Sequence, residues 1–108
     1  MRFFAAAALC AILVSGQQIQ CATGLQLFVS RGTGEAPGQG VTGNITQAVL
    51  GLIPGSSVQP IDYPATLENP SYFDSVRNGT KTLRESLIEY TSACPNTKIA
   101  VLGYSQAR

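Results

Sequence analysis

A chain of 108 residues is usually one domain, and 44% hydrophobic against 12% charged residues argues for a globular protein over a disordered one. Seven Lys and Arg against six Asp and Glu give a formal charge of +1, and the basic residues form no cluster. We therefore expect no nucleic-acid partner.

The N-terminus has the layout of a secretory signal peptide. Arg2 supplies a positive charge, an apolar stretch covers residues 3–14, and Ser15 and Gly16 are small. As a helix this stretch would reach under about 20 Å, too short for the roughly 30 Å core of a bilayer. We expect residues 1–16 to be removed on secretion, leaving residues 17–108 as one extracellular domain without a membrane partner. A membrane anchor and a buried helix are the weaker alternatives.

The first half of this domain predicts a strand, a helix and a second strand. Strand-forming residues over 25–29 precede the turn-rich stretch 30–40 and predict a buried strand. A short amphipathic helix follows, stopped by Pro54-Gly55. Its predicted apolar face consists of Ile45, Ala48, Val49 and Leu52. The second strand covers 57–61 and ends before Pro64, which restricts the preceding residue to non-helical geometry.

The second half predicts a long helix and a third strand. Ser71 is a good N-cap, and Asp74 adds an acid to the first turn of an amphipathic helix over 71–91. Its predicted apolar face consists of Phe73, Val76, Thr80, Leu83 and Leu87, opposite Arg77, Lys81, Arg84 and Glu85. The continuous apolar run over 98–103 predicts a central parallel strand covered on both faces.

This alternation of strands and helices predicts an α/β fold with a parallel sheet and right-handed crossovers. With only three strands, the apolar strand over 98–103 would remain an unpaired edge, which is an aggregation hazard.

Two features fit a secreted chain. Loss of Cys10 with the signal peptide leaves Cys21 and Cys94, which pair most simply as a disulfide in an oxidising compartment, with two free thiols as the alternative. Such a bridge is worth roughly 4 kcal/mol in the chain-entropy model. Asn44 and Asn78 each begin an acceptor sequence for N-glycosylation, which can be used or unused.

Ser105 is the first candidate for chemistry. It lies in Gly103-Tyr104-Ser105-Gln106, directly after the last predicted strand, where a nucleophile elbow exposes its serine and the next backbone amide can stabilise an oxyanion. Taken alone, the motif is also compatible with an ordinary serine in a loop.

The glycine-rich loop over 31–40 is the second candidate, because loops after parallel strands line the ligand crevice of open sheets. Its glycine spacing does not match a dinucleotide fingerprint, and no Gly-Lys-Ser/Thr follows it. We therefore expect neither a nucleotide cofactor nor a metal. The loop is either part of an active site or a plain connection.

Three segments together resemble a known enzyme family. They are Arg31-Gly32-Thr33, Asp62-Tyr63-Pro64-Ala65, and Cys94-Pro95-Asn96-Thr97-Lys98-Ile99 leading into Gly103-Tyr104-Ser105-Gln106. On these motifs, the chain resembles the cutinase and acetylxylan esterase family from about Cys21 to Gln106.

The resemblance implies a parallel-sheet α/β-hydrolase fold, truncated here after the nucleophile elbow. It implies a secreted, monomeric serine esterase without a cofactor, acting on cutin, acetylated xylan or small esters through an acyl-enzyme. By position, Ser105 would be the nucleophile, and Thr33 with the backbone amide of Gln106 would form the oxyanion hole. The resemblance also supports a disulfide between Cys21 and Cys94.

The sequence departs from the family in two ways. Ala107 stands where the family has a glycine, and its methyl group is expected to strain the turn. No histidine is present, and Asp62 and Asp74, the only aspartates, both precede Ser105, whereas the fold places the acid and the histidine after the nucleophile.

A missing triad histidine costs on the order of 10⁶ in kcat in a well-studied serine protease. We therefore expect this polypeptide to be inactive, as the product of a truncated transcript or a misplaced exon junction. The alternative is a non-catalytic secreted binding or decoy protein that retains half of the fold.

Overall fold

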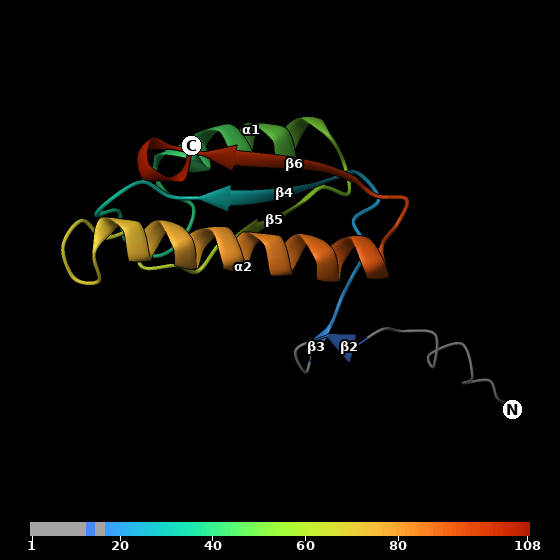
Figure 1. Ribbon diagram of the computed structural model, residues 1–108. Helices are drawn as coiled ribbons and strands as arrows, with labels where there is room; N and C mark the ends of the chain where they lie inside the picture. Colours follow the sequence, from blue (N-terminus) through green and yellow to red (C-terminus); the bar gives the residue numbers. More distant parts are fainter. Residues whose placement is uncertain (1–12, 15–16) are drawn as a thin grey trace, which may run out of the picture.

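The computed structural model describes residues 13–14 and 17–108 (Figure 1). The predicted signal peptide, residues 1–16, therefore lies outside the described residues except for Leu13–Val14. That segment forms β2, which pairs antiparallel with β3 (Gln17–Gln18). No helix within the described ranges is long and apolar enough to cross a membrane.

A three-stranded parallel sheet forms the centre of the fold. Its strands lie in the order β5-β4-β6. Their bounds are Leu25–Ser30 for β4, Ser57–Pro60 for β5 and Lys98–Gly103 for β6. Because all three run in one direction, the loops that follow them meet at one edge of the sheet.

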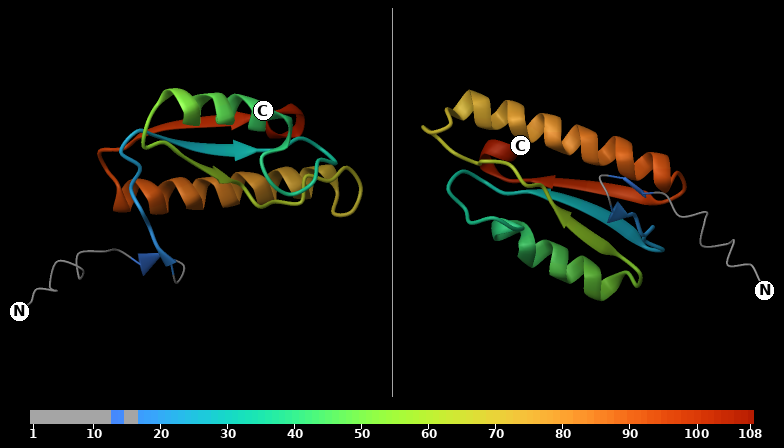
Figure 2. Two further views of the ribbon diagram at one scale, coloured as in Figure 1. Left: turned by 180° about the vertical axis from the view of Figure 1, so that it is seen from behind. Right: turned by 90° about the horizontal axis from the view of Figure 1, so that it is seen from below.

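Two helices connect the strands and cover opposite faces of the sheet. They are α1 (Gly43–Leu52), preceded by the short 3-10 helix η2 (Gly40–Thr42), and α2 (Tyr72–Ala93). The right view of Figure 2 shows the sheet between α1 and α2, which makes three layers. The chain ends in a second 3-10 helix, η3 (Ser105–Ala107), at the edge of the sheet to which the strands point (Figure 1).

All five predicted elements are confirmed, and so is their order. The start of α2 follows its predicted cap: the backbone N–H of Asp74 donates to Ser71 Oγ at 3.1 Å. Arg77 pairs with the Asp74 carboxylate at 2.8 Å. Hydrogen bonding from Arg77 and Ser71 lowers the pKa of Asp74 below its ordinary value, which fits an acid in the first turn.

The core lies mainly between β4 and α2. Phe28 is fully buried, and its ring meets the ring of Tyr90 edge to face at 5.7 Å. Ile61, Tyr63, Ala65 and Cys94 complete this cluster of buried residues. Since side chains alternate along a strand, Leu27 and Val29, each at most 1% exposed, lie on the opposite face, toward α1.

The strand predicted to be central is an edge strand. β6 pairs only with β4 among the described strands, and Val101 is 50% exposed. The buried central strand is β4. An apolar run predicts a strand but not its neighbours, which depend on the strands present to pair with it.

The predicted apolar faces of both helices are partly wrong. Ile45 and Leu52 of α1 are 56% and 79% exposed, whereas Thr46 is fully buried. Thr46 tolerates burial because its hydroxyl donates to the backbone carbonyl of Gly43 at 2.9 Å. In α2, Phe73 is 72% exposed, although Leu83 and Leu87 pack against the core cluster as predicted.

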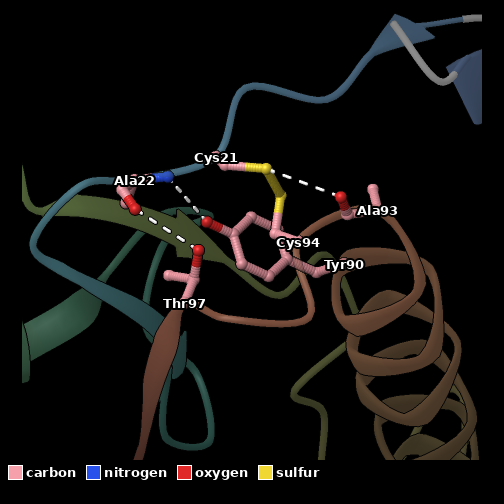
Figure 3. Close-up of a disulfide and its surroundings, with 6 residues drawn as sticks. All are labelled: Cys21, Ala22, Tyr90, Ala93, Cys94 and Thr97. Atoms are coloured by element: carbon pink, nitrogen blue, oxygen red, sulfur yellow. Dashed lines mark hydrogen bonds between the residues drawn. A yellow bond between two sulfur atoms is a disulfide. The ribbon is translucent and has the colours of Figure 1, made fainter. Parts of the chain in front are cut away.

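The disulfide between Cys21 and Cys94 is present, with the two Cα atoms 5.5 Å apart (Figure 3). It joins the segment before β4 to the end of α2. Two hydrogen bonds strengthen the same junction: Ala22 N–H donates to the Tyr90 hydroxyl at 2.9 Å, and the Thr97 hydroxyl donates to Ala22 O at 3.3 Å. These contacts hold the two segments together at the end of the sheet away from Ser105.

Candidate active site

Ser105 is exposed at the tip of the turn that follows β6. Its φ is +58°, a left-handed conformation that is uncommon for a residue with a side chain. A β-carbon on Gly103 would lie 2.4 Å from the backbone oxygen of Ala107, so only glycine fits before this turn. A sharp turn with an exposed serine after a parallel strand has the geometry of a nucleophile elbow.

Ala107 stands at the position expected to strain the turn. The positive φ of the turn lies at Ser105 and not at Ala107. Ala107 is partly buried and packs against the core cluster. The close contact of this turn is instead made possible by Gly103.

The glycine-rich loop after β4 lies directly against this elbow. A β-carbon on Gly32 would lie 2.8 Å from Cδ2 of Tyr104 and 3.1 Å from Cβ of Ser105. A side chain at position 32 would therefore push the loop away from the serine. The loop that carries Thr33 and the turn that carries Ser105 are neighbours, as the resemblance implied.

Glu35 holds the loop in shape from inside. One carboxylate oxygen accepts the backbone N–H of Gly32 and the other that of Val41, both at 2.8 Å. A second tie is the hydrogen bond from Gly34 N–H to Ala65 O at 2.9 Å. These bonds give the loop a defined shape beside Ser105.

Arg31 and Tyr63 support the loop from below. The Tyr63 hydroxyl donates to the backbone oxygen of Arg31, whose guanidinium lies 5.3 Å from the centre of the Tyr63 ring. Arg31 is only 4% exposed and donates to Glu35 O at 2.8 Å and Pro64 O at 3.3 Å. Burial raises the pKa of Tyr63, against the opposing effect of Arg31, so its hydroxyl keeps its proton and remains a donor.

Gln106 joins the two loops through its side chain. Its Nε2 donates to Thr33 Oγ1 at 2.8 Å and to Thr66 O at 2.9 Å. Its Oε1 accepts from the Ser75 hydroxyl at 2.6 Å. Thr33, Ser105 and Gln106, the residues predicted for the site, are therefore brought together at one edge of the sheet.

A shallow depression of about 470 Å³ opens beside Thr33. Its walls include Gly34, Ala65, Thr66 and Leu67. The lining is mainly apolar and also includes the Thr33 hydroxyl, Glu68 and Asn69.

The two aspartates lie apart from this arrangement. Asp62 is exposed, and Asp74 pairs with Arg77 at the start of α2. The described residues contain no cluster of His, Cys, Asp and Glu side chains that could hold a metal ion. The site as described consists of a serine and hydrogen-bond donors.

Sequence reasoning missed several supporting residues, namely Glu35, Thr66 and Ser75. Ser75 is fully buried, yet in the sequence it is only one more polar residue in the first turn of a helix. Glu35 is an acid within a glycine-rich loop, which predicts nothing specific. The one signal that could have been used is Tyr63-Pro64-Ala65, which is interpreted above only as the end of the second strand and as part of the resemblance.

A comparison with known families identifies this arrangement. The family model described as Cutinase matches residues 21–108. The chain belongs to the cutinase family. The match includes every residue placed in the site above.

Individual relatives of the chain are named acetylxylan esterase and cutinase. The chain is 34% identical over 87 residues to acetylxylan esterase 2 of Talaromyces purpureogenus, covering 76% of the chain and 37% of the relative. It is 31% identical over 110 residues to cutinase 11 of Verticillium dahliae, covering 89% of the chain and 37% of the relative. The chain thus spans well under half the length of these relatives.

Solved structures show the same fold. An acetylxylan esterase solved at 0.90 Å resolution matches with a TM-score of 0.76 and 33% identity, over 82% of the chain and 44% of that structure. The catalytic core domain of acetyl xylan esterase from Trichoderma reesei also gives a TM-score of 0.76, at 29% identity, over 82% of the chain and 45% of that structure. The α/β-hydrolase fold of the cutinase type is therefore confirmed.

Proposed function

We propose that this chain carries the nucleophile and the oxyanion hole of a secreted serine esterase that hydrolyses carboxylic esters through an acyl-enzyme. One observation carries the proposal: Ser105 adopts a left-handed conformation after β6, with Gly32 of the Thr33 loop packed against it. This geometry combines an exposed nucleophile with donors for an oxyanion.

Each residue has a defined role in the proposed reaction. Ser105 Oγ attacks the ester carbonyl, forming a carbon–oxygen bond while the carbonyl oxygen becomes an oxyanion. The Thr33 hydroxyl and the backbone N–H of Gln106 donate to that oxyanion. The alcohol then leaves with a proton, and water releases the acid from the acyl-enzyme.

The proton of Ser105 needs a base, and among the described residues no side chain is hydrogen-bonded to Ser105 as a base would be. The sequence has no histidine, and the exposed Asp62 and the ion-paired Asp74 make no hydrogen bond to Ser105 in the described structure. We therefore propose that this polypeptide alone is close to inactive, and that esterase activity belongs to a longer product of the same gene. The short coverage of the relatives supports this reading.

The substrate class follows from the relatives and the depression beside Thr33. Relatives are named cutinase and acetylxylan esterase, which supports a substrate among cutin, acetylated xylan and small esters. The open depression bordered by Ala65 and Leu67 supports a short or flexible acyl group over a bulky rigid one.

Two features support secretion. The disulfide between Cys21 and Cys94 needs an oxidising compartment. Asn44 and Asn78, the two proposed glycosylation sites, are both exposed. An extracellular polymer or a small ester would be the partner.

A non-catalytic binding or decoy protein is the second candidate. The absence of histidine favours it for the polypeptide as given, since the fold around Ser105 could retain a ligand without cleaving it. The two candidates differ in what the gene encodes after Gln106.

Sequencing the messenger RNA across the codon for Gln106 separates these candidates. The esterase proposal expects a frame that continues with glycine and then supplies an aspartate and a histidine in that order. Its product should hydrolyse 4-nitrophenyl acetate, and Ser105→Ala should lower kcat by on the order of 10⁶. A message that stops after Arg108 favours the non-catalytic protein, and a product whose activity survives Ser105→Ala overturns the assignment of the nucleophile.

A further inference from the structure

A closed ring of hydrogen bonds lies beneath the proposed oxyanion hole. The backbone N–H of Thr66 donates to Ser75 Oγ at 3.1 Å, and the Ser75 hydroxyl donates to Gln106 Oε1 at 2.6 Å. Gln106 Nε2 closes the ring by donating to the backbone oxygen of Thr66 at 2.9 Å. The Ser75 hydroxyl, the Gln106 side-chain amide and the backbone N–H and C=O of Thr66 thus supply one another's hydrogen-bond partners.

The direction of every bond in this ring is fixed by Thr66. A backbone carbonyl can only accept, so the Gln106 atom that faces Thr66 O must be the nitrogen. A backbone N–H can only donate, so Ser75 Oγ accepts from Thr66 and keeps its own proton for Gln106. The side-chain amide of Gln106 therefore has one permitted orientation.

This orientation determines the role of Thr33. The second proton on Gln106 Nε2 points to Thr33 Oγ1 at 2.8 Å, so the threonine oxygen accepts. A hydroxyl that accepts from an amide keeps its single proton for another acceptor. Among the described residues no acceptor for that proton is found, which leaves it available to a substrate oxyanion.

We propose that Ser75 is a positioning residue of the esterase site, which together with the Thr66 carbonyl holds the Gln106 amide so that Thr33 must donate its proton to the oxyanion. The inference rests on the proposed function, because it assigns Thr33 to the oxyanion hole. Ser75 lies on α2, is fully buried and is separated from the substrate by Gln106 and Thr33. It would not touch the reacting atoms.

Burial makes Ser75 effective in this role. Gln106 is 7% exposed, so water cannot readily replace a lost partner of its amide oxygen. Removing the Ser75 hydroxyl would leave Gln106 Oε1 and Thr66 N–H without a partner. The amide would then be held by the Thr66 carbonyl alone, and its orientation toward Thr33 would be less strictly fixed.

The test uses NMR on the 108-residue chain and needs no esterase activity. In the unaltered chain, the Gln106 side-chain amide protons and the Thr66 backbone N–H should exchange with water more slowly than the side-chain amide of the exposed Gln47. Ser75→Ala should speed exchange of both groups about tenfold and shift the Thr33 side-chain signals. Ser71→Ala, which removes the cap of the same helix, serves as the control and should leave these signals unchanged.

Either of two results overturns the inference. One is fast exchange of the Gln106 amide in the unaltered chain, which needs no variant to fold. The other is a Ser75→Ala chain whose Gln106 and Thr33 signals match those of the unaltered chain. Neither result bears on whether Ser105 is a nucleophile, which the activity of the longer product decides separately.

Discussion

Gly32 and Ser105 lie so close that a β-carbon on the glycine would be 3.1 Å from the β-carbon of the serine. The same added atom would lie 2.8 Å from the Tyr104 ring, closer than real β-carbons approach. The close fit of the two loops therefore depends on the missing side chain at position 32.

Gly32→Ala should separate these loops and destabilise the chain by about 1–3 kcal/mol, as overpacking does in tight interiors. Gly51→Ala is the matched control, because Gly51 lies in α1 with open space around its α-carbon. That substitution should stabilise the chain by about 0.5–1 kcal/mol through helix propensity. Urea unfolding monitored by circular dichroism measures both, and equal effects of the two variants would contradict the packing at Gly32.

Much of the fold was predictable because each element has a local signal. Ser71 caps α2 as its sequence position indicates, and Pro54-Gly55 follows the end of α1. The buried faces of the helices were harder to predict. Thr46 can be buried because of a local hydrogen bond, which a pattern of apolar residues does not reveal. The same holds for Ser75, whose partners lie 9 and 31 residues away along the chain.

The site itself was predictable only in part. Ser105 follows an apolar strand, and its role came from motif and resemblance together. Glu35 and Tyr63 support the Thr33 loop through contacts to backbone atoms, which any sequence could offer. The Tyr63 contact depends on how loops from two strands meet, and the Glu35 contacts are to backbone amides of its own loop, which no side-chain pattern marks.

The disulfide between Cys21 and Cys94 closes a loop with a sequence separation of 73 residues. Cys94→Ala should destabilise the chain by roughly 4 kcal/mol in the chain-entropy model, which is a large part of the stability of a small domain. Urea unfolding of the oxidised protein measures the loss. Cys21→Ala and the double variant should lose the same amount, because each removes the same bond, and a clearly larger loss in the double variant would contradict this pairing.

Tyr63 should make stability depend on pH at the alkaline end. Burial raises the pKa of Tyr63 in the folded chain above its unfolded value of about 10. The unfolded chain therefore loses this proton first, so the stabilising effect is complete below pH ~10 and is lost as the pH rises through the folded pKa.

Tyr63→Phe should remove the part of the alkaline stability loss that comes from this residue. It should also cost about 0.5–1.5 kcal/mol at neutral pH, because the hydrogen bond to Arg31 O disappears. Thermal unfolding from pH 7 to 11 tests this, with Tyr104→Phe at an exposed tyrosine as the control. An unchanged alkaline profile in Tyr63→Phe would show that other groups cause the loss.

The open side of β6 should make the isolated chain prone to association. β6 pairs only with β4 in the described structure, and Val101 is half exposed on it, so an apolar strand presents unpaired backbone groups to other molecules. Val101→Lys places a charge on this edge and should keep the chain monomeric at concentrations where the unaltered chain associates.

Ile88→Lys is the control, since Ile88 of α2 is 57% exposed and gains the same charge away from any strand edge. Analytical ultracentrifugation of the three chains should show that only Val101→Lys prevents association. Equal protection by both variants would mean that general apolar exposure, and not the strand edge, drives it.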